Sequence, residues 1–370
     1  MKLKVLACQL LAFSIAAAAS ADVAMVEHQA LRKSLAKPPK VKHGHPVKAT
    51  GSQALIDNSG VKYFINTNIT FSTSSSASAA MSEASYTHAV AATTSGGGTT
   101  SSTLDDAYDG YNTMCLSLNN TVATCQTGNA NFVIYNKNGP ATTECRGAAS
   151  GVDRQVVFPA QVAGNITMQR KVFVPDNDSF GRWLNYFTNT GATPQTVTMV
   201  VANNLGSDSN TVIVTSSNGN ATAEVTDTWV TTFQNYSGNT SSDPRLGHVF
   251  QGPGAVTPLA GINFANGDDN PFWGYTFTLN PGQTKIIMNF AVVQPSKAAA
   301  AAKSATLVGL PPNALQCTTL AEQLEIANFV AAQPIVTVPT LSGIGLFTLA
   351  AGLGLAAMAL LLRRRRSATV

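Results

Sequence analysis

Apolar and polar residues alternate along the middle of the chain with a period of two. From 166 to 174, one face carries Ile166, Met168, Arg170, Val172 and Val174, and the positions between them are Thr167, Gln169, Lys171 and Phe173. Further on, Val197, Met199 and Val201 alternate with threonines, and Val212-Ile213-Val214 is bounded by polar turn formers. This spacing predicts β-strands with two different faces.

The clearest turn signal lies late in this region, at Asn280-Pro281-Gly282-Gln283. Pro at the second position and Gly at the third favour a type II turn, because only Gly accepts the positive φ cheaply. Apolar residues alternate on both sides of this turn: Trp273, Tyr275, Phe277 and Leu279 before it, and Ile286, Met288, Phe290 and Val292 after it. The pattern predicts a β-hairpin.

Several strands separated by Gly, Asn and Pro turns predict a mainly β protein, an antiparallel β-sandwich over residues 56–297. Its length allows one large sandwich or two small ones. Residues 298–332 then favour short helices, since Ala298–Ala302 are strong helix formers and Leu320–Ile326 has a second helical composition.

The N-terminus has the three parts of a secretory signal peptide, residues 1–21. Lys2 and Lys4 supply positive charge, Val5–Ala18 is apolar, and Ala19-Ser20-Ala21 forms a small-residue cleavage site. We therefore expect Sec-type export and a mature chain that begins at Asp22.

The C-terminus is predicted to cross a membrane. Residues 341–362 form a run of 22 residues without a charge, long enough to span the hydrocarbon as a single transmembrane helix. An Arg-rich tail at 363–370 opens with Arg363, Arg364, Arg365 and Arg366. Because such charge favours the cytoplasmic side, the rest of the chain is predicted to lie outside.

A short motif precedes this helix, in the extended stalk at 333–340. Val338, Pro339, Thr340, Leu341, Ser342 and Gly345 fit the pattern IPTL-S-x-W-G, with Val338 in place of Ile and Ile344 in place of Trp. Motif, helix and arginine cluster together resemble the IPTL-CTERM sorting signal, a relative of PEP-CTERM. The resemblance covers about a tenth of the chain and implies processing by an exosortase-like protease, with release to the cell surface or extracellular matrix. The alternative is an uncut tail anchor.

Charge is unevenly distributed. Charged residues make up only 11% of the chain, and much of the positive charge lies in the tail and in a basic lead-in at 22–55. This lead-in holds Arg32, Lys33, Lys37, Lys40, Lys42 and Lys48. We expect it to be disordered, either solvated or lying against anionic polysaccharide. The central part has an acidic surplus, which argues against nucleic-acid binding.

Four cysteines lie in the mature chain, and an even number after export favours two disulfides over a zinc site. A three-residue hairpin loop at 119–121 would place Cys115 opposite Cys125. Cys145 would then pair with Cys317. No C-x-x-C or H-x-x-x-H spacing supports zinc.

Candidate chemistry is sparse. His248 is the one histidine within the strongly β region, where a structural or surface role competes with a general base. Three acidic segments could hold Ca²⁺, although Asp and Asn are also common in turns: Asp105-Asp106-Ala107-Tyr108-Asp109, Asp176-Asn177-Asp178 and Asp268-Asp269-Asn270. We expect no other cofactor and no resident metal.

Two functions fit these features. The first is a non-enzymatic structural or adhesive protein of the cell surface or matrix, associated with cell-envelope or extracellular polysaccharide. The second is a polysaccharide-binding module, or a glycan-active hydrolase. Trp183 follows a polar loop and is the candidate glycan contact, whereas Trp273 lies on an alternating strand face and is expected in the core.

The sorting prediction has a direct test in mass spectrometry of the native protein. Processing predicts a C-terminus near Thr340 in the surface and medium fractions. Retention of Arg363–Arg366 in every fraction would instead make the segment a permanent anchor.

Overall fold

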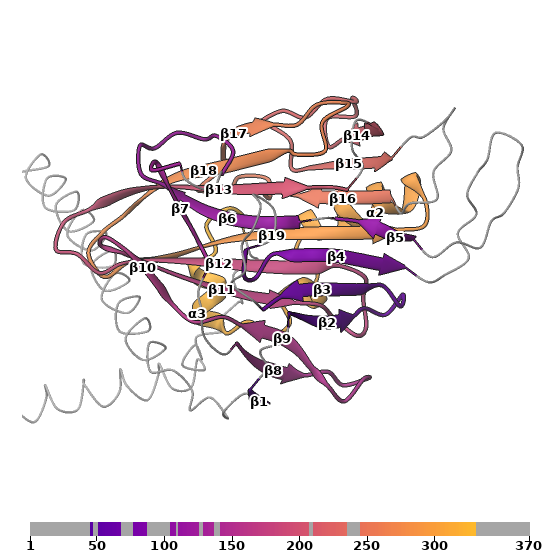
Figure 1. The fold of residues 1–370 in the computed structure, drawn as a ribbon, viewed down its shortest axis with the longest axis horizontal. Helices are drawn as coiled ribbons and strands as arrows, with labels where there is room; N and C mark the ends of the chain where they lie inside the picture. The colour runs from indigo at the N-terminus through magenta and orange to yellow at the C-terminus, as the bar shows by residue number, and fades with distance from the viewer. Residues whose placement is uncertain are drawn as a thin grey trace, which may run out of the picture. The chain divides into compact units, whose positions relative to one another are not determined.

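The computed structural model describes residues 45–46, 51–67, 77–86, 104–108, 110–125, 129–136, 141–206, 210–234 and 245–330. Side chains are described for these residues except at 45–46, 86 and 104–107. In this part the chain is mainly β, with two large antiparallel sheets and few helices (Figure 1). The fold class predicted from the alternating pattern is confirmed at this level.

The first sheet contains 10 of the described strands, in the order β1-β8-β9-β11-β12-β19-β16-β15-β14, with β10 also on β11. Its strands are β1 His45–Pro46, β8 Thr142–Arg146, β9 Asp153–Val157, β10 Gln161–Ala163, β11 Ile166–Phe173, β12 Gly181–Asn189, β14 Thr211–Ser216, β15 Trp229–Gln234, β16 Arg245–Val249 and β19 Thr284–Gln294. The sheet thus joins strands that lie far apart in sequence.

The second sheet contains 9 of the described strands, in the order β17-β18-β13-β6-β4-β3-β2, with β5 on β4 and β7 on β6. Its strands are β2 Ser52–Ile56, β3 Lys62–Asn66, β4 Met81–Tyr86, β5 Leu104–Ala107, β6 Gly110–Ser117, β7 Phe132–Ile134, β13 Gln195–Asn204, β17 Leu259–Asn263 and β18 Phe272–Leu279. Both sheets draw on early and late parts of the chain, so they form one large sandwich.

The main core lies between the two sheets. One cluster of buried apolar side chains takes Ile166, Met168 and Val172 from the first sheet, and Val197, Met199 and Val201 from the second. These are the faces that the alternation predicted. Burial of such side chains stabilises each by roughly 1.5–3 kcal/mol relative to exposure, so this core is the principal source of stability.

Helices cover the outer face of the first sheet. Helix α2, Lys297–Val308, contacts β15, β16 and β19, and helix α3, Leu320–Glu325, contacts β19. Between them, η2 spans Pro312–Leu315. Each α-helix starts at a side-chain cap, Ser296 for α2 and a Thr319–Glu322 capping box for α3. The predicted short C-terminal helices are confirmed.

The β-hairpin predicted around Asn280–Gln283 does not form. The turn at Asn280–Gln283 forms, with Gly282 at φ 73° and the Gln283 amide donating to the Asn280 carbonyl at 2.9 Å. However, β18 pairs within the second sheet and β19 within the first, so the two strands form an arch and the predicted hairpin is wrong. The reason is that β19 is buried on both faces: Ile287 faces the other sheet, and Met288 and Phe290 face the helices.

Both predicted disulfides are present, Cys115–Cys125 with Cα atoms 6.1 Å apart and Cys145–Cys317 with Cα atoms 5.7 Å apart. The hairpin predicted around residues 119–121 does not form. Cys115 pairs across the sheet with Ile134 of β7, and residues 121–125 form no strand. The second disulfide ties β8 to the segment that connects η2 with α3.

The basic lead-in is shorter than predicted. Residues 52–56 already form β2, and His45–Pro46 pair with β8. Residues 22–44 and 47–50 of the lead-in, the predicted signal peptide at 1–21, the predicted sorting motif at 338–345 and the arginines at 363–366 lie outside the described residues. Within the described residues, no helix is both long enough and apolar enough to cross a membrane.

The two disulfides close loops of very different length. Cys145 and Cys317 are 172 residues apart in sequence, whereas Cys115 and Cys125 are 10 residues apart. Loop-closure entropy grows with the logarithm of this length, so the Cys145→Ser/Cys317→Ser double variant should lose about 4–5 kcal/mol of unfolding free energy. Guanidinium unfolding under non-reducing conditions measures the loss. The Cys115→Ser/Cys125→Ser control should lose about 2 kcal/mol less; an equal or larger loss in the control contradicts this ranking.

Candidate functional site

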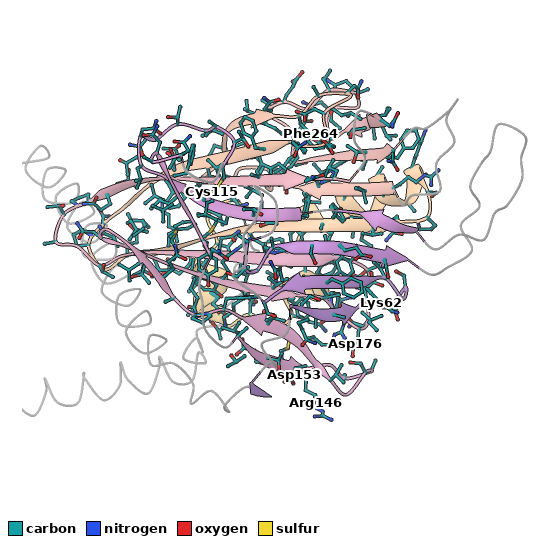
Figure 2. All side chains as sticks on the ribbon, in the orientation of Figure 1. Lys62, Cys115, Arg146, Asp153, Asp176 and Phe264 are labelled. Carbon is teal, nitrogen blue, oxygen red and sulfur yellow. A yellow bond between two sulfur atoms is a disulfide. The ribbon has the colours of Figure 1, made fainter. Side chains whose placement is uncertain are left out.

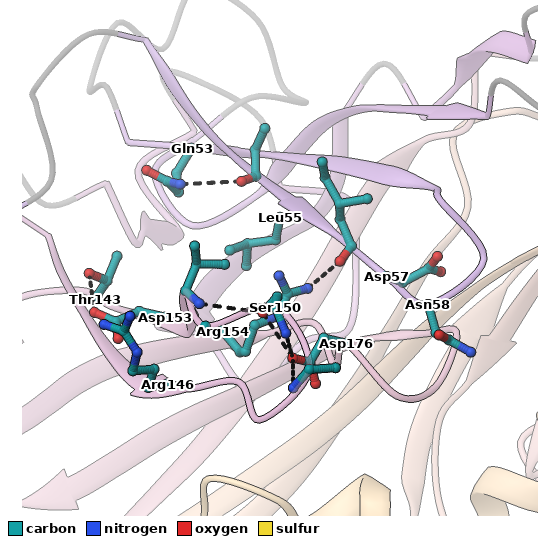
Figure 3. Close-up of a pocket in the computed structure, with 15 residues that line it drawn as sticks. Gln53, Leu55, Asp57, Asn58, Thr143, Arg146, Ser150, Asp153, Arg154 and Asp176 are labelled. Atoms are coloured by element: carbon teal, nitrogen blue, oxygen red, sulfur yellow. Dashed lines mark hydrogen bonds between the residues drawn. The ribbon is translucent and has the colours of Figure 1, made fainter.

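An open groove of about 1020 Å³ lies where an edge of the second sheet meets the β8–β9 hairpin of the first (Figure 3). One wall is β2 with the turn that follows it, and the other is the 147–152 turn with the start of β9. Figure 2 places Arg146, Asp153 and Asp176 in this region of the molecule, away from Cys115 and Phe264. The side chains that line the groove include Gln53, Ile56, Asp57, Asn58, Thr143, Arg146, Ser150, Val152, Asp153, Arg154 and Asp176.

Asp176, in the loop after β11, fixes the β8–β9 turn. Its Oδ2 accepts hydrogen bonds from the Ala149 amide at 3.0 Å, the Ser150 amide at 2.7 Å and the Ser150 hydroxyl at 2.8 Å. A Cβ on Gly147 would lie 2.2 Å from Oδ2, so the turn requires glycine there. Burial alone would raise the pKa of Asp176, but these hydrogen bonds outweigh burial and lower it.

Arg154 joins the two walls at the base of the groove. Its side chain, only 4% exposed, reaches from β9 to the Ile56 carbonyl on β2. It also donates to the Val174 carbonyl at 2.8 Å and the Pro175 carbonyl at 3.3 Å. Burial lowers its pKa, while Asp176 and Asp57 oppose that shift. Because these carbonyls occupy the guanidinium, Arg154 holds the edges of the sheets in register.

Asp57 is the group in the groove with the most unusual pKa. Burial raises this pKa from 3.8 to about 6, despite hydrogen bonds that favour the anion. Its Oδ1 accepts from the Ser59 amide and hydroxyl and the Val61 amide, and its Oδ2 accepts from the Tyr63 hydroxyl at 3.2 Å. At 5% exposure, with both oxygens engaged, Asp57 anchors the turn after β2.

The accessible surface of the groove mixes apolar and polar groups. Ile56 is 44% exposed and Val152 is 54% exposed, one on each wall. Arg146 is exposed at the end of β8, in register with Asp153 of β9. Asn58 is also exposed. Apolar side chains beside hydrogen-bonding groups suit an extended ligand with both hydroxyl groups and apolar faces.

Among the described residues that line the groove, no Ser–His pair is present. The Ser150 hydroxyl donates to a carboxylate, and no histidine lines the groove. Nucleophilic catalysis by serine needs a base that accepts its proton and is itself oriented by a third group.

His248 lies in the sealed core, away from the groove. It is 0% exposed, and its ring nitrogens are 3.0 Å from the Thr232 and Tyr111 hydroxyl oxygens. Burial lowers its pKa to about 3, so the ring is neutral at physiological pH. Of the two roles considered from the sequence, the structural one is correct.

Trp183 is not available as a glycan contact. Its ring is 0% exposed, and its indole N–H donates to the Ala79 carbonyl at 2.7 Å. It lies on the inner face of β12 and packs against Tyr111 in the core, so the prediction of an exposed platform is wrong. Trp273 is also fully buried, as its strand position predicted.

The acidic segments do not form a metal site in the described part of the chain, where no three ligand side chains cluster. Asp176 caps a turn, and Asp268 accepts from the Asn270 amide at 2.9 Å. The side chains of Asp105, Asp106 and Asp109 lie outside the description. The turn-capping role considered for these residues therefore applies to Asp176 and Asp268.

Sequence reasoning missed the groove as a site. Its walls come from residues near 55, 150 and 176, and nothing in their spacing indicates that they meet. The local signals were the turn formers Asp57-Asn58-Ser59-Gly60, the glycines at 147 and 151, and the acidic segment Asp176-Asn177-Asp178.

No family model and no curated protein matches this chain. Among solved structures, a polysaccharide lyase is similar over 70% of this chain and 35% of its own, with 12% identity and a TM-score of 0.36. A galactose mutarotase-like protein from Lactobacillus casei is similar over 66% of this chain and 100% of its own, with 10% identity and a TM-score of 0.34. The heparan sulfate lyase HepC from Pedobacter heparinus has 14% identity over 45% of this chain and 23% of its own, with a TM-score of 0.29. The chain thus spans about a third or less of either lyase, and likeness at this level defines no activity for it.

The raised pKa of Asp57 predicts a pH-dependent stability. Between pH 3.8 and about 6 the folded state binds more protons than the unfolded state, so the unfolding free energy falls as pH rises through this window. Asp57→Asn removes this loss. From pH 4 to pH 7, the unfolding free energy of the variant should therefore rise by about 2–3 kcal/mol relative to that of the wild type. Denaturant unfolding across that pH range measures the difference. Parallel stability curves for the two proteins would contradict it.

Proposed function

We propose that this protein is an exported cell-surface protein that binds polysaccharide of the envelope or extracellular matrix. The groove between β2 and the β8–β9 turn is the binding site. The polymer chain lies along the groove, with Ile56 and Val152 against the apolar faces of its sugar rings. Arg146 and the exposed amide of Asn58 hydrogen-bond to its hydroxyl or carboxylate groups.

The observation that carries this proposal is the open groove itself, about 1020 Å³ and bounded by rigid elements. Hydrogen bonds of Arg154 and of Asp176 Oδ2 hold its walls, so the site is formed before a ligand arrives. Preorganisation of this kind lowers the ordering cost of binding. Since carboxylates and arginines both line the groove, it suits neutral or weakly acidic sugars better than a dense polyanion.

The termini support the proposed location. The signal peptide at 1–21 and the disulfides fit export to an oxidising compartment. The IPTL-type motif at Val338–Gly345, followed by the apolar segment and Arg363–Arg366, fits a precursor anchored in the inner membrane. An exosortase-like protease would then release it to the surface.

The test uses the full exported protein and polysaccharide fractions from the producing cell's envelope and medium. Arg146→Ala should weaken binding about 5- to 10-fold, because a charge-assisted hydrogen bond contributes roughly 1.5–3 kcal/mol before partial replacement by water. Isothermal titration calorimetry or affinity electrophoresis measures the change.

The matched control is Lys285→Ala. Lys285 is the second residue of β19, beside the Asn280–Gln283 turn, and it pairs with Phe187 near the end of β12 that lies away from the Asp176 loop. Its loss should therefore leave binding unchanged. Equal binding by the Arg146 and Lys285 variants would show that the groove is not the binding site. Failure of the wild-type protein to bind any fraction would contradict the proposed polysaccharide binding.

A further inference from the structure

The inner face of the first sheet contains a fully buried arginine. Arg170 lies on β11 among Met168 and Val172, and it is 0% exposed. Burial lowers its pKa to about 9, which still leaves the guanidinium charged at neutral pH. The structure therefore holds a permanent positive charge between its two sheets.

The partners of Arg170 carry no full charge. Its Nε donates to Asn185 Oδ1 at 2.8 Å, and its Nη2 donates to the Asn112 carbonyl at 2.8 Å and Asn112 Oδ1 at 2.6 Å. The Tyr135 ring centroid is 5.9 Å from its Cζ. No carboxylate forms an ion pair with Arg170 among the side chains described.

Two donors next to this contact have no partner in the described structure. They are Arg170 Nη1 and Asn112 Nδ2, both buried. Nη1 shares a carbon with Nη2, and Nδ2 shares a carbon with Oδ1, so they flank the same 2.6 Å hydrogen bond. The orientation of the Asn112 amide follows from chemistry, since a guanidinium only donates and must face Oδ1.

Arg182 provides an internal comparison, because it is also 0% exposed. Its Nη1 donates to the carbonyls of Ala314 and Gln316, both at 2.7 Å, and its Nη2 donates to Gln155 Oε1 at 2.9 Å. Coulombic attraction from Glu322 also offsets its burial. Both terminal nitrogens of Arg182 are thus satisfied and its Nε lacks a partner, whereas Arg170 lacks a partner at one terminal nitrogen and no carboxylate contributes to its pKa.

A buried charge without a counter-charge costs several kcal/mol, and each unpaired buried donor adds roughly 1–3 kcal/mol. One small anion at the two free donors would relieve both penalties. We propose that Arg170 Nη1 and Asn112 Nδ2 bind a monovalent halide, chloride under physiological conditions, between the two sheets. The site is separate from the groove and independent of the proposed function.

Chloride fits the donors better than other common anions. A divalent anion would over-compensate a single guanidinium, and an organic carboxylate would require a larger space among packed side chains. A water molecule could accept from the same donors, but it would leave the charge of Arg170 uncompensated. The experiment therefore has to distinguish halide from water.

The first measurement is made on the wild-type full chain. Crystals soaked in sodium bromide should show an anomalous peak within hydrogen-bond distance of Arg170 Nη1. In solution, the melting temperature should rise by about 3 °C per tenfold increase in chloride above its Kd, with sodium gluconate holding the ionic strength constant. No bromide peak, together with equal effects of chloride and gluconate, would show that only water occupies the site and would overturn the proposal.

The second measurement replaces the anion with a side chain. Asn112→Asp puts a carboxylate against Arg170, and Asp tolerates the positive φ of 64° at this position. This variant should remain folded, lose the bromide peak and lose the chloride dependence of its melting temperature. Unchanged chloride dependence in Asn112→Asp contradicts the assignment.

The matched control is Asn204→Asp, which makes the same chemical change in the same sheet. Asn204 Oδ1 accepts from the Gly206 amide at 2.9 Å, a role that Asp also performs, and Asn204 makes no contact with Arg170. It should keep the full chloride dependence. Loss of that dependence in the control would mean that net charge, and not the Arg170 site, produces the effect.

Discussion

Burial of the first sheet on both faces is the constraint from which the rest of the structure follows. Its inner face packs against the second sheet, and its outer face packs against α2, η2 and α3. Strands such as β19 are therefore apolar on both sides, and burial on both sides stabilises them more than one-sided packing could. Because both faces are covered, the accessible backbone lies at the sheet edges, and the groove forms where β2 and the β8–β9 hairpin approach each other.

The buried arginines of this sandwich differ in how their guanidinium groups are hydrogen-bonded. Arg182 satisfies the carbonyls at the end of η2, so its burial also fastens the helical layer to the sheet. Arg154 likewise uses backbone carbonyls to hold two sheet edges together. Arg170 differs because two donors at one contact, its own Nη1 and Asn112 Nδ2, are unmet, and no carboxylate offsets its burial as Glu322 does for Arg182. This difference between the arginines matters because a low-dielectric interior strengthens each hydrogen bond that is made. It also raises the free-energy cost of each buried donor that has no partner.

The sequence predicted individual strands better than their partners. Alternation located β11, β13 and β14, and it also placed Arg170 on the buried face of β11, the one signal of the internal charge. The predicted turn at Asn280–Gln283 forms, but the hairpin predicted around it does not. A turn of this kind can join two strands of one sheet or two strands of different sheets, and the sequence does not distinguish them. The cysteine pairs were right, although Cys115 lies opposite β7 and not opposite Cys125 on a neighbouring strand.

Local composition by itself located most of the strands and helices and predicted the export and sorting segments, since each depends on residues close in sequence. The count of four cysteines limited the disulfides to a small number of pairings. Tertiary structure alone decided which strands share a sheet, that Trp183 is buried, and that Asp57, Arg154 and Asp176 meet in one groove. These outcomes depend on which faces are covered and which edges stay open. Faces and edges are set by long-range packing between segments separated by a hundred residues or more, and no local pattern encodes it.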